Sequence, residues 1–264
     1  MTFSFKRVFA LMRVFWIIQR RSILVTVGAV YAVLFALFLF GTVTNAGWES
    51  GLEYHRVLFT TTFVIGGLIA TSVSFASMHR AERSYTYLAL PASHAEKFIE
   101  KLLLTAVVYP LAALLSYFVY SLVPAGVSLL LTNSSFVVFD PVEVEVFASV
   151  RAFVVASSVF LFGAAYFRSR HFIKTVLSLA AVFILLSVVG AGTAWTAFGD
   201  IIQGIETGAF DGTVASAEEL SELGFLAMRV GRGVKLVLMW VLPPVMWVLT
   251  WQRLREVEVS DAVH

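Results

Sequence analysis

Five ionisable residues fall within eight consecutive positions of the chain, directly before a long apolar segment. They are His94, Glu96, Lys97, Glu100 and Lys101. Groups of these types can transfer protons, bind a metal ion or form a charged surface that a partner recognises. The motifs around them and the rest of the composition favour one of these uses.

The sequence contains no catalytic or metal-binding motif that would recruit these groups. It has neither H-E-x-x-H nor G-x-S-x-G, and it has no cysteine, which excludes thiolate metal sites and cysteine nucleophiles. His79 and Glu82 share a helix face without a further ligand nearby, which favours a surface pair over a metal site. The chain also lacks G-x-x-x-x-G-K-[ST], so an ATP-driven activity would need a separate ATPase. We expect no catalytic residue, no metal and no cofactor.

The segment 90–97 has the pattern of a helix start. Pro91 disfavours helical geometry at Leu90, and Ser93 followed by Glu96 is the pattern of a capping box. The helix then continues through Lys97 into the apolar segment that follows.

The whole loop 79–101 is too long for a plain hairpin. Its proline and its helix cap argue against a flexible linker. Arg83, Tyr85 and Tyr87 add charge and aromatic rings upstream of the capped helix. The loop therefore predicts a rigid surface that suits the transmission of force from a cytoplasmic partner. The simpler alternative is that the capped helix only begins a transmembrane segment and that its charges only orient the chain in the membrane.

The composition indicates a polytopic membrane protein. Of its 264 residues, 59% are hydrophobic and only 14% are charged, and the mean hydropathy is +0.87. Soluble domains have about a quarter of their residues charged. The net charge of +2 does not indicate a nucleic-acid partner, because the basic residues are placed as membrane topology requires. We expect an all-α fold that contacts the lipid bilayer.

Six segments are long and apolar enough to cross about 30 Å of hydrocarbon as helices. They are 22–41, 57–78, 102–123, 148–167, 175–195 and 234–251. Together they form one transmembrane domain, 22–251, and a tail, 252–264, follows it. The apolar run of the third continues past Pro124, which predicts a helix that is long, bent or followed by a re-entrant piece. No span carries an acidic residue, which argues against an ion-coupled carrier.

The Lys and Arg residues orient these spans. With the N-terminus inside, 14 of the 19 basic residues fall in the inner segments, whereas 11 of the 17 acidic residues fall in the outer ones. Both termini are therefore predicted to be cytoplasmic.

Residues 1–21 predict an amphipathic helix that lies in the inner membrane interface. Six apolar residues approximate one helical stripe: Phe5, Val8, Phe9, Met12, Phe15 and Trp16. Arg7 and Arg21 fall on the opposite side. The alternative is a basic flank that only anchors the orientation. The apolar run of the first span is too long for a signal peptide, so we expect no cleavage.

The outer segment 196–233 is expected to hold amphipathic helices that dip against the outer leaflet as a re-entrant segment does. Ser216 and Glu219 have the spacing of a capping box. Gly204, Gly208 and Gly212 follow the GxxxG spacing, but acidic residues interrupt the stretch, which favours flexibility over helix packing.

Three prolines mark candidate hinges in the spans. Pro110 in the third span and Pro243 and Pro244 in the sixth remove backbone donors, so we expect kinks there.

The second cytoplasmic turn gathers four polar or basic side chains: Tyr166, Arg168, Arg170 and His171. A signal that sets the topology is the favoured interpretation, and contact with lipid headgroups or a partner is the alternative.

In combination these features resemble an ABC-2 type transporter permease, and the architectural likeness covers the whole chain. The short permeases of Bacteroidetes-like bacteria carry a YLxLPAS…EKF segment. This chain matches it at Tyr87, Leu88, Leu90, Pro91, Ala92, Ser93, Glu96, Lys97 and Phe98. The likeness of individual residues is limited to these nine positions.

The resemblance implies a coupling helix in the first cytoplasmic loop, seated in a cleft of an ABC ATP-binding subunit. The residues expected at this contact are Arg83, Tyr85, Tyr87, Leu90, Pro91, Ser93, Glu96 and Lys97. It further implies a permease in the bacterial cytoplasmic (inner) membrane, most often an exporter, that pairs with a second permease of the same or a homologous sequence. ATP would be hydrolysed only in the partner, and no substrate is implied. The alternative is a non-transporting membrane scaffold or sensor subunit.

Overall fold

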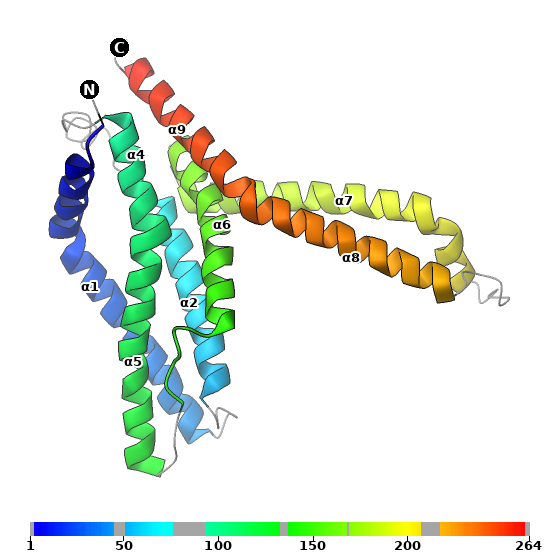
Figure 1. The fold of residues 1–264 in the computed structure, drawn as a ribbon. Helices are drawn as coiled ribbons and strands as arrows, with labels where there is room; N and C mark the ends of the chain where they lie inside the picture. The colour runs from blue at the N-terminus through cyan, green and yellow to red at the C-terminus, as the bar shows by residue number, and fades with distance from the viewer. Residues whose placement is uncertain are drawn as a thin grey trace.

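The computed structural model describes residues 3–44, 51–75, 93–132, 137–167, 169–206 and 217–261, and the regular structure within these ranges is entirely helical. The elements are α1 (Phe5–Val43), α2 (Leu52–Ser72), α4 (His94–Leu103), the π-helical segment η1 (Leu104–Val108), α5 (Tyr109–Thr132), α6 (Val144–Tyr166), α7 (His171–Glu206), α8 (Ala217–Trp240) and α9 (Leu242–Asp261) (Figure 1). The predicted all-α fold is confirmed for these residues.

Helices α1, α2, α5 and α6 form a bundle, with α4 and α9 at one end of it (Figure 1). The N-terminal ends of α1 and α4 and the C-terminal end of α9 lie at this same end. The C-terminal end of α1 and the N-terminal end of α2 lie at the opposite end. The described parts of the two predicted cytoplasmic termini and the start of α4 therefore lie at one end of the bundle.

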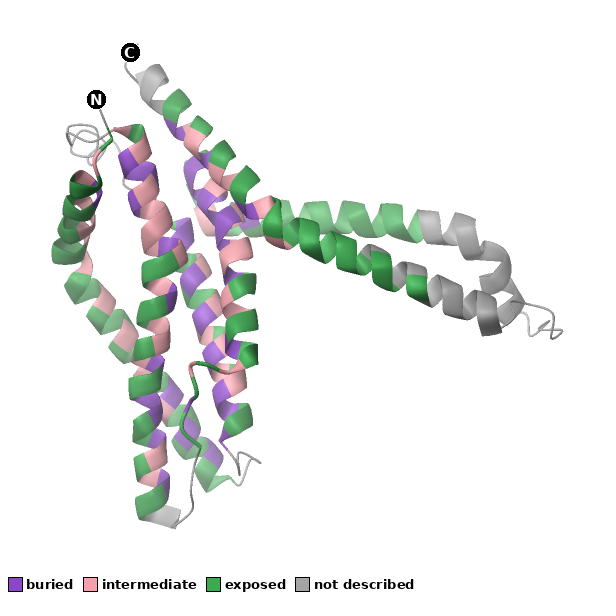
Figure 2. Ribbon diagram, viewed as in Figure 1, coloured by how far each residue is buried: buried purple, intermediate pink, exposed green. Residues whose placement is uncertain are grey.

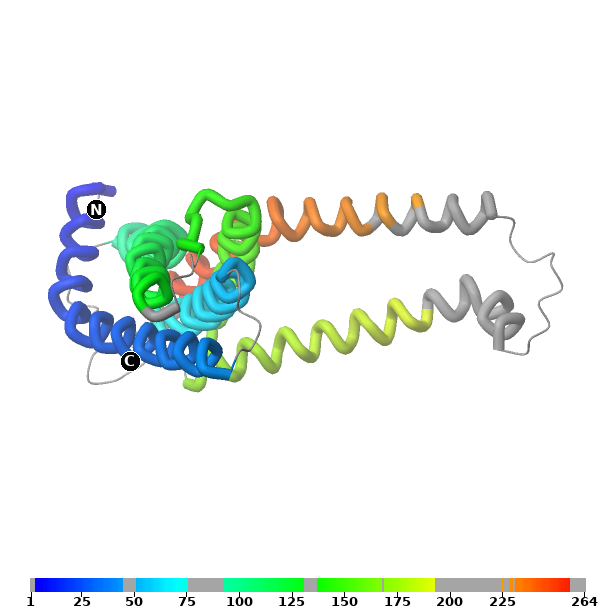
Figure 3. The backbone as a smooth tube through the Cα atoms, turned by 90° about the horizontal axis from the view of Figure 1, so that it is seen from below, coloured from blue at the N-terminus to red at the C-terminus, as the bar shows by residue number. Residues whose placement is uncertain are grey.

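Helices α7 and α8 leave the bundle and extend away from it (Figures 1 and 3). Their described side chains are mostly exposed, whereas buried residues concentrate in the bundle (Figure 2). The helical character expected within 196–233 is confirmed for the parts that belong to α7 and α8. Ser216, Gly208 and Gly212 lie outside the described residues.

Five helical segments are long and apolar enough to cross a membrane. They are Phe5–Val43, His94–Leu130, Val144–Tyr166, His171–Gly192 and Gly231–Glu256. The predicted span 57–78 is not among them, because its described part belongs to α2, which begins with Glu53, His55 and Arg56 and carries several hydroxyl residues. The chain thus has the character of a multi-pass membrane protein.

The predicted boundary between an interfacial helix and the first span is not a break in the helix. α1 runs without interruption from Phe5 to Val43, and it changes direction along its length (Figure 3). The apolar stripe of its N-terminal part is divided between two environments. Val8 is buried and Phe15 is half-buried, whereas Phe9 is 65% exposed.

The third predicted span lies within a single column formed by α4, η1 and α5 (Figure 1). Of the three forms expected for this run, the long helix is the one observed, with Pro124 inside α5. Pro110 is the second residue of α5, two positions after the end of η1. Because proline cannot donate to the carbonyl four residues earlier, a π-helical turn accommodates it without ending the helix.

The sixth predicted span is interrupted at Val241, between α8 and α9. Pro243 and Pro244 stand in the first turn of α9, where the missing N–H groups leave no intrahelical bond unmade. The irregularity expected at these prolines is therefore a break between two helices.

Two hydrophobic clusters hold the bundle together. The larger one consists of Leu34, Phe59, Phe63, Tyr117, Tyr120, Phe139, Val146 and Phe153. The smaller one, which joins α4, α6 and α9, consists of Phe75, Phe98, Leu161, Ala164, Ala165 and Leu254. Gly67 allows α2 to approach closely, because a Cβ atom there would overlap the rings of Tyr109 and Phe153.

Candidate functional site: the junction of α1 and α4

The capped start of α4 has the geometry that its sequence predicts. Ser93 is the N-cap, and its hydroxyl accepts from the backbone N–H of Glu96 at 3.3 Å. The Glu96 carboxylate accepts in return from the backbone N–H of Ser93 at 2.8 Å. The predicted capping box is therefore confirmed.

The same carboxylate also closes the start of α1. Oε1 of Glu96 accepts from the backbone N–H of Ser4 at 2.7 Å and from Nε of Arg7 at 2.9 Å. Nη2 of Arg7 lies 2.8 Å from the same oxygen. α1 has no acidic residue in its own first turn, and the side chain of its N-cap, Ser4, makes no capping bond. Glu96 supplies from α4 the negative charge that a helix N-terminus favours.

Burial separates this ion pair from an ordinary surface pair. The side chain of Glu96 is 0% exposed, whereas that of Arg7 is 37% exposed. A carboxylate withdrawn from water is costly unless hydrogen bonds satisfy it. Backbone N–H groups and a guanidinium satisfy Glu96, so the carboxylate fixes two helix starts to each other.

A second contact between α1 and α4 lies further along both helices. Nζ of Lys101 is 3.1 Å from Oε2 of the buried Glu100 and 4.9 Å from the centroid of the Phe15 ring on α1. A cation above a ring adds attraction to the contact, more so where water is excluded. Lys97 is buried as well, at 4% exposed. The charged side chains of α4 thus take part in contacts within the chain.

α4 is also joined to the far side of the bundle. Phe98 belongs to the cluster that contains Leu161 of α6 and Leu254 of α9, and Ile99 and Trp251 pack against that cluster. A displacement of α4 would therefore have to move or strain three other helices.

The predicted coupling residues fall into two groups. Arg83, Tyr85, Tyr87, Leu90 and Pro91 lie outside the described residues, and Ser93, Glu96 and Lys97 lie in or next to α4.

Glu96 and Lys97 do not belong to an exposed docking surface, because both are buried. Reversing their charges would disturb contacts within the chain. Such variants would therefore not isolate the binding of a partner.

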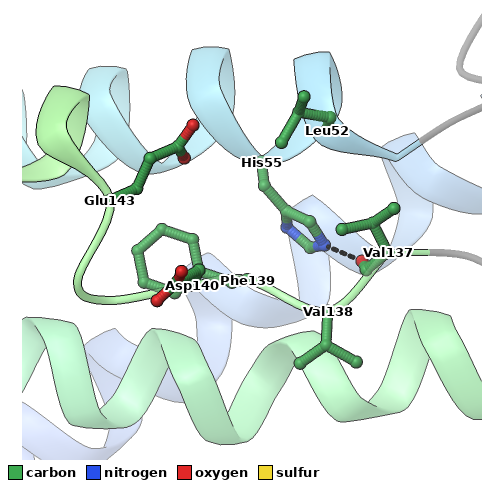
Figure 4. Close-up of a pocket in the computed structure, with 7 residues that line it drawn as sticks. All are labelled: Leu52, His55, Val137, Val138, Phe139, Asp140 and Glu143. Carbon is green, nitrogen blue, oxygen red and sulfur yellow. Dashed lines mark hydrogen bonds between the residues drawn. The ribbon is translucent and has the colours of Figure 1, made fainter.

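A pocket of about 170 Å³ lies at the other end of the bundle, between the start of α2 and the segment that leads into α6 (Figure 4). His55 points into it, and its Nε2 lies 2.9 Å from the carbonyl oxygen of Val137. Its Nδ1 lies 3.2 Å from the hydroxyl of Tyr117. Since a carbonyl can only accept, Nε2 carries the proton and donates, and the tyrosine hydroxyl donates to Nδ1.

Tyrosine hydroxyls continue this polar group into the bundle. The hydroxyls of Tyr54 and Tyr120 are 2.7 Å apart, and Tyr54 donates to the carbonyl of Leu34 at 2.9 Å. Tyr31 stacks on Tyr120 with ring centroids 4.9 Å apart. These bonds satisfy hydroxyls that burial would otherwise penalise.

Beside the pocket, Arg56 bridges two carboxylates. Its Nη2 lies 2.8 Å from Glu143, and its Nε lies 2.9 Å from Glu145. Within the described ranges, no group of three His, Asp or Glu side chains could hold a metal ion.

Two residues of these sites, Arg7 and His55, are not predicted from the sequence. Arg7 was assigned to the polar side of an amphipathic helix, and no local pattern indicates that its partner is Glu96, 89 positions later. His55 has no motif around it. The spacing of Tyr117 and Tyr120 on one helix face is the only sequence signal near it.

Comparisons with protein-family models, with curated proteins and with solved structures found no match for this chain.

Proposed function

We propose that this chain is the membrane-spanning permease subunit of a bacterial ABC transporter, most often an exporter, which uses ATP hydrolysed by a separate subunit. The proposal rests on the resemblance of its sequence features to ABC-2 type permeases and on its apolar helices. The single observation that carries it is the junction of α1 and α4.

The junction gives a physical route for force. Glu96 fixes the start of α4 to Ser4 and Arg7 of α1, and α4 continues through η1 into α5 without a break. A partner that pushes on the loop 79–101 would therefore act on α1 and on the column from His94 to Leu130 together. In this account Glu96 is a positioning residue, and contact with the ATPase falls to other residues of the loop.

In the proposed topology, 57–78 crosses the membrane as well, as the second of six spans, and both termini are cytoplasmic in the inner membrane. The basic residues support this orientation. The N-terminal ends of α1 and α4 and the C-terminal end of α9 also lie at one end of the bundle (Figure 1).

A second permease completes the proposed assembly. The exposed apolar side chains of α7 and α8, among them Leu177, Phe183 and Leu236, support it because they need a nonpolar environment. Lipid or a second copy would supply that environment.

The alternative is a scaffold or sensor subunit that spans the membrane without transporting. The same junction would then hold α1 and α4 in a fixed arrangement, with no ATPase to move them.

A mild-detergent pull-down of the tagged chain from its native membranes, followed by mass spectrometry, separates the two functions. We expect a P-loop ATPase at a near-stoichiometric ratio. A preparation that lacks any ATPase, in a detergent that keeps known membrane complexes together, would contradict the proposed function and favour the scaffold.

A further inference from the structure

Three basic residues surround the place where α6 ends and α7 begins. Arg170 lies in the turn, Lys174 lies in the first turn of α7, and Arg253 belongs to α9. Arg170 and Lys174 are exposed. We call these three residues the turn patch.

Aromatic rings connect the cations of the turn patch. The guanidinium of Arg253 lies 5.3 Å from the centroid of the Tyr166 ring, and the Tyr166 and Phe167 rings meet edge to face at 5.3 Å. Nζ of Lys174 lies 5.8 Å from the centroid of the Phe167 ring. A row of cation, ring, ring and cation thus runs from α9 to α7 across the end of α6.

Few acidic residues balance this charge. Glu256 is paired with Arg253, whose Nη1 lies 2.8 Å from its carboxylate. The described part of the chain gives Arg170 and Lys174 no carboxylate partner. The turn patch therefore keeps an excess of positive charge on its surface.

The turn patch stands next to an exposed apolar surface. Ile173, Val176 and Leu177 of α7 are 55%, 40% and 62% exposed. Cations and aromatic rings at the border of an apolar surface are typical of the headgroup region of a membrane, where long basic side chains reach phosphate oxygens.

We infer that the turn patch binds the headgroups of anionic phospholipids. The inference goes beyond the proposed function and does not depend on it, because a scaffold would bind the same lipids. A lipid is favoured over an acidic protein surface because the exposed apolar side chains of α7 continue directly from the cations, as the acyl chains of a lipid continue from its headgroup.

The test compares lipid retention by two charge-matched variants of the full chain. Arg170→Gln with Lys174→Gln removes two cations of the turn patch, and Arg232→Gln with Lys235→Gln removes two exposed cations of α8. Each purified protein is titrated with phosphatidylglycerol or phosphatidylcholine and analysed by native mass spectrometry.

We expect the turn-patch variant to bind phosphatidylglycerol about 30-fold more weakly than the wild type does, since each cation near an anionic surface contributes about five-fold to the affinity. Binding of phosphatidylcholine should be the same for the wild type and for both neutralised variants. Arg170→Lys with Lys174→Arg keeps both charges and should restore the affinity, which separates loss of charge from loss of folding.

Equal phosphatidylglycerol binding by the two neutralised variants would overturn the inference. Retention of lipid together with loss of a copurifying protein would overturn it as well and would assign the turn patch to a protein partner.

Discussion

At the scale of single residues, one carboxylate, that of Glu96, caps the N-termini of two helices. Glu96 caps its own helix through Ser93 and accepts from Ser4 and Arg7 of α1. Replacing the carboxylate by an amide removes the negative charge that pairs with Arg7, and the one remaining acceptor oxygen cannot accept all the bonds that the two carboxylate oxygens accept. Such a loss destabilises a buried site.

We predict that Glu96→Gln loosens the start of α1 and leaves the bundle folded. Hydrogen exchange followed by mass spectrometry should show faster exchange in the first turns of α1 and α4. Glu145→Gln is the control, because it removes a more exposed partner of Arg56, where an ion pair contributes at most about 1 kcal/mol. Unchanged exchange in α1 of the Glu96 variant would contradict this role.

His55 gives the second prediction at this scale. It lies before the predicted span 57–78, and burial lowers its pKa from the usual value, although the hydrogen bond to the Val137 carbonyl acts in the opposite direction. The folded protein therefore binds this proton less readily than the unfolded chain. The stability that comes from neutral His55 is complete above about pH 6.5 and is lost as the pH falls through the folded-state pKa.

Thermal unfolding of the detergent-solubilised protein between pH 7.5 and pH 5 tests whether protonation of His55 lowers the stability. We expect the Tm of the wild type to fall more steeply with acid than that of His55→Gln. The difference corresponds to at most about 1.4 kcal/mol of unfolding free energy per pH unit between the two pKa values. Parallel curves for the two proteins would show that His55 does not titrate in this way.

At the scale of elements, close approach between helices depends on single glycines. Gly67 of α2 faces the rings of Tyr109 and Phe153, so a methyl group there would push α2 away from α5 and α6. We predict that Gly67→Ala lowers the stability by about 1–3 kcal/mol through overpacking.

Gly126→Ala is the matched control for Gly67→Ala. No atom lies within 4 Å of a Cβ atom built at Gly126, so this change should be neutral or slightly stabilising through helix propensity. Thermal stability assays of the two variants measure the difference. Equal Tm values would contradict the packing of α2 described here.

The features of these helices that could be predicted from the sequence are those that depend on neighbouring residues. The capping box at Ser93, the helical character of the apolar segments and the irregularities at Pro110 and Pro243 could be predicted, because each depends on residues close in sequence. The junction of Arg7 with Glu96 and the cluster around His55 could not, because they join residues 62 to 89 positions apart. Hydropathy likewise does not reveal that α7 and α8 leave the bundle.

At the scale of the whole molecule, the topology can be tested because the chain contains no cysteine. We predict that Val138→Cys reacts with a membrane-impermeant maleimide added to intact spheroplasts and that Arg255→Cys reacts only after the membrane is opened. Both positions are partly or fully exposed, so access through the protein does not limit the reaction. The opposite labelling pattern would invert the proposed orientation.

The central claim is that a separate ATPase acts on the loop 79–101. The most direct measurement is site-specific crosslinking in native membranes, with Tyr87→Cys and, as the control, Val138→Cys in the cysteine-free chain. The account predicts that Tyr87→Cys crosslinks to a P-loop ATPase, identified by mass spectrometry, and that Val138→Cys does not. No crosslink to an ATPase from position 87, or equal crosslinking from both positions, would contradict it.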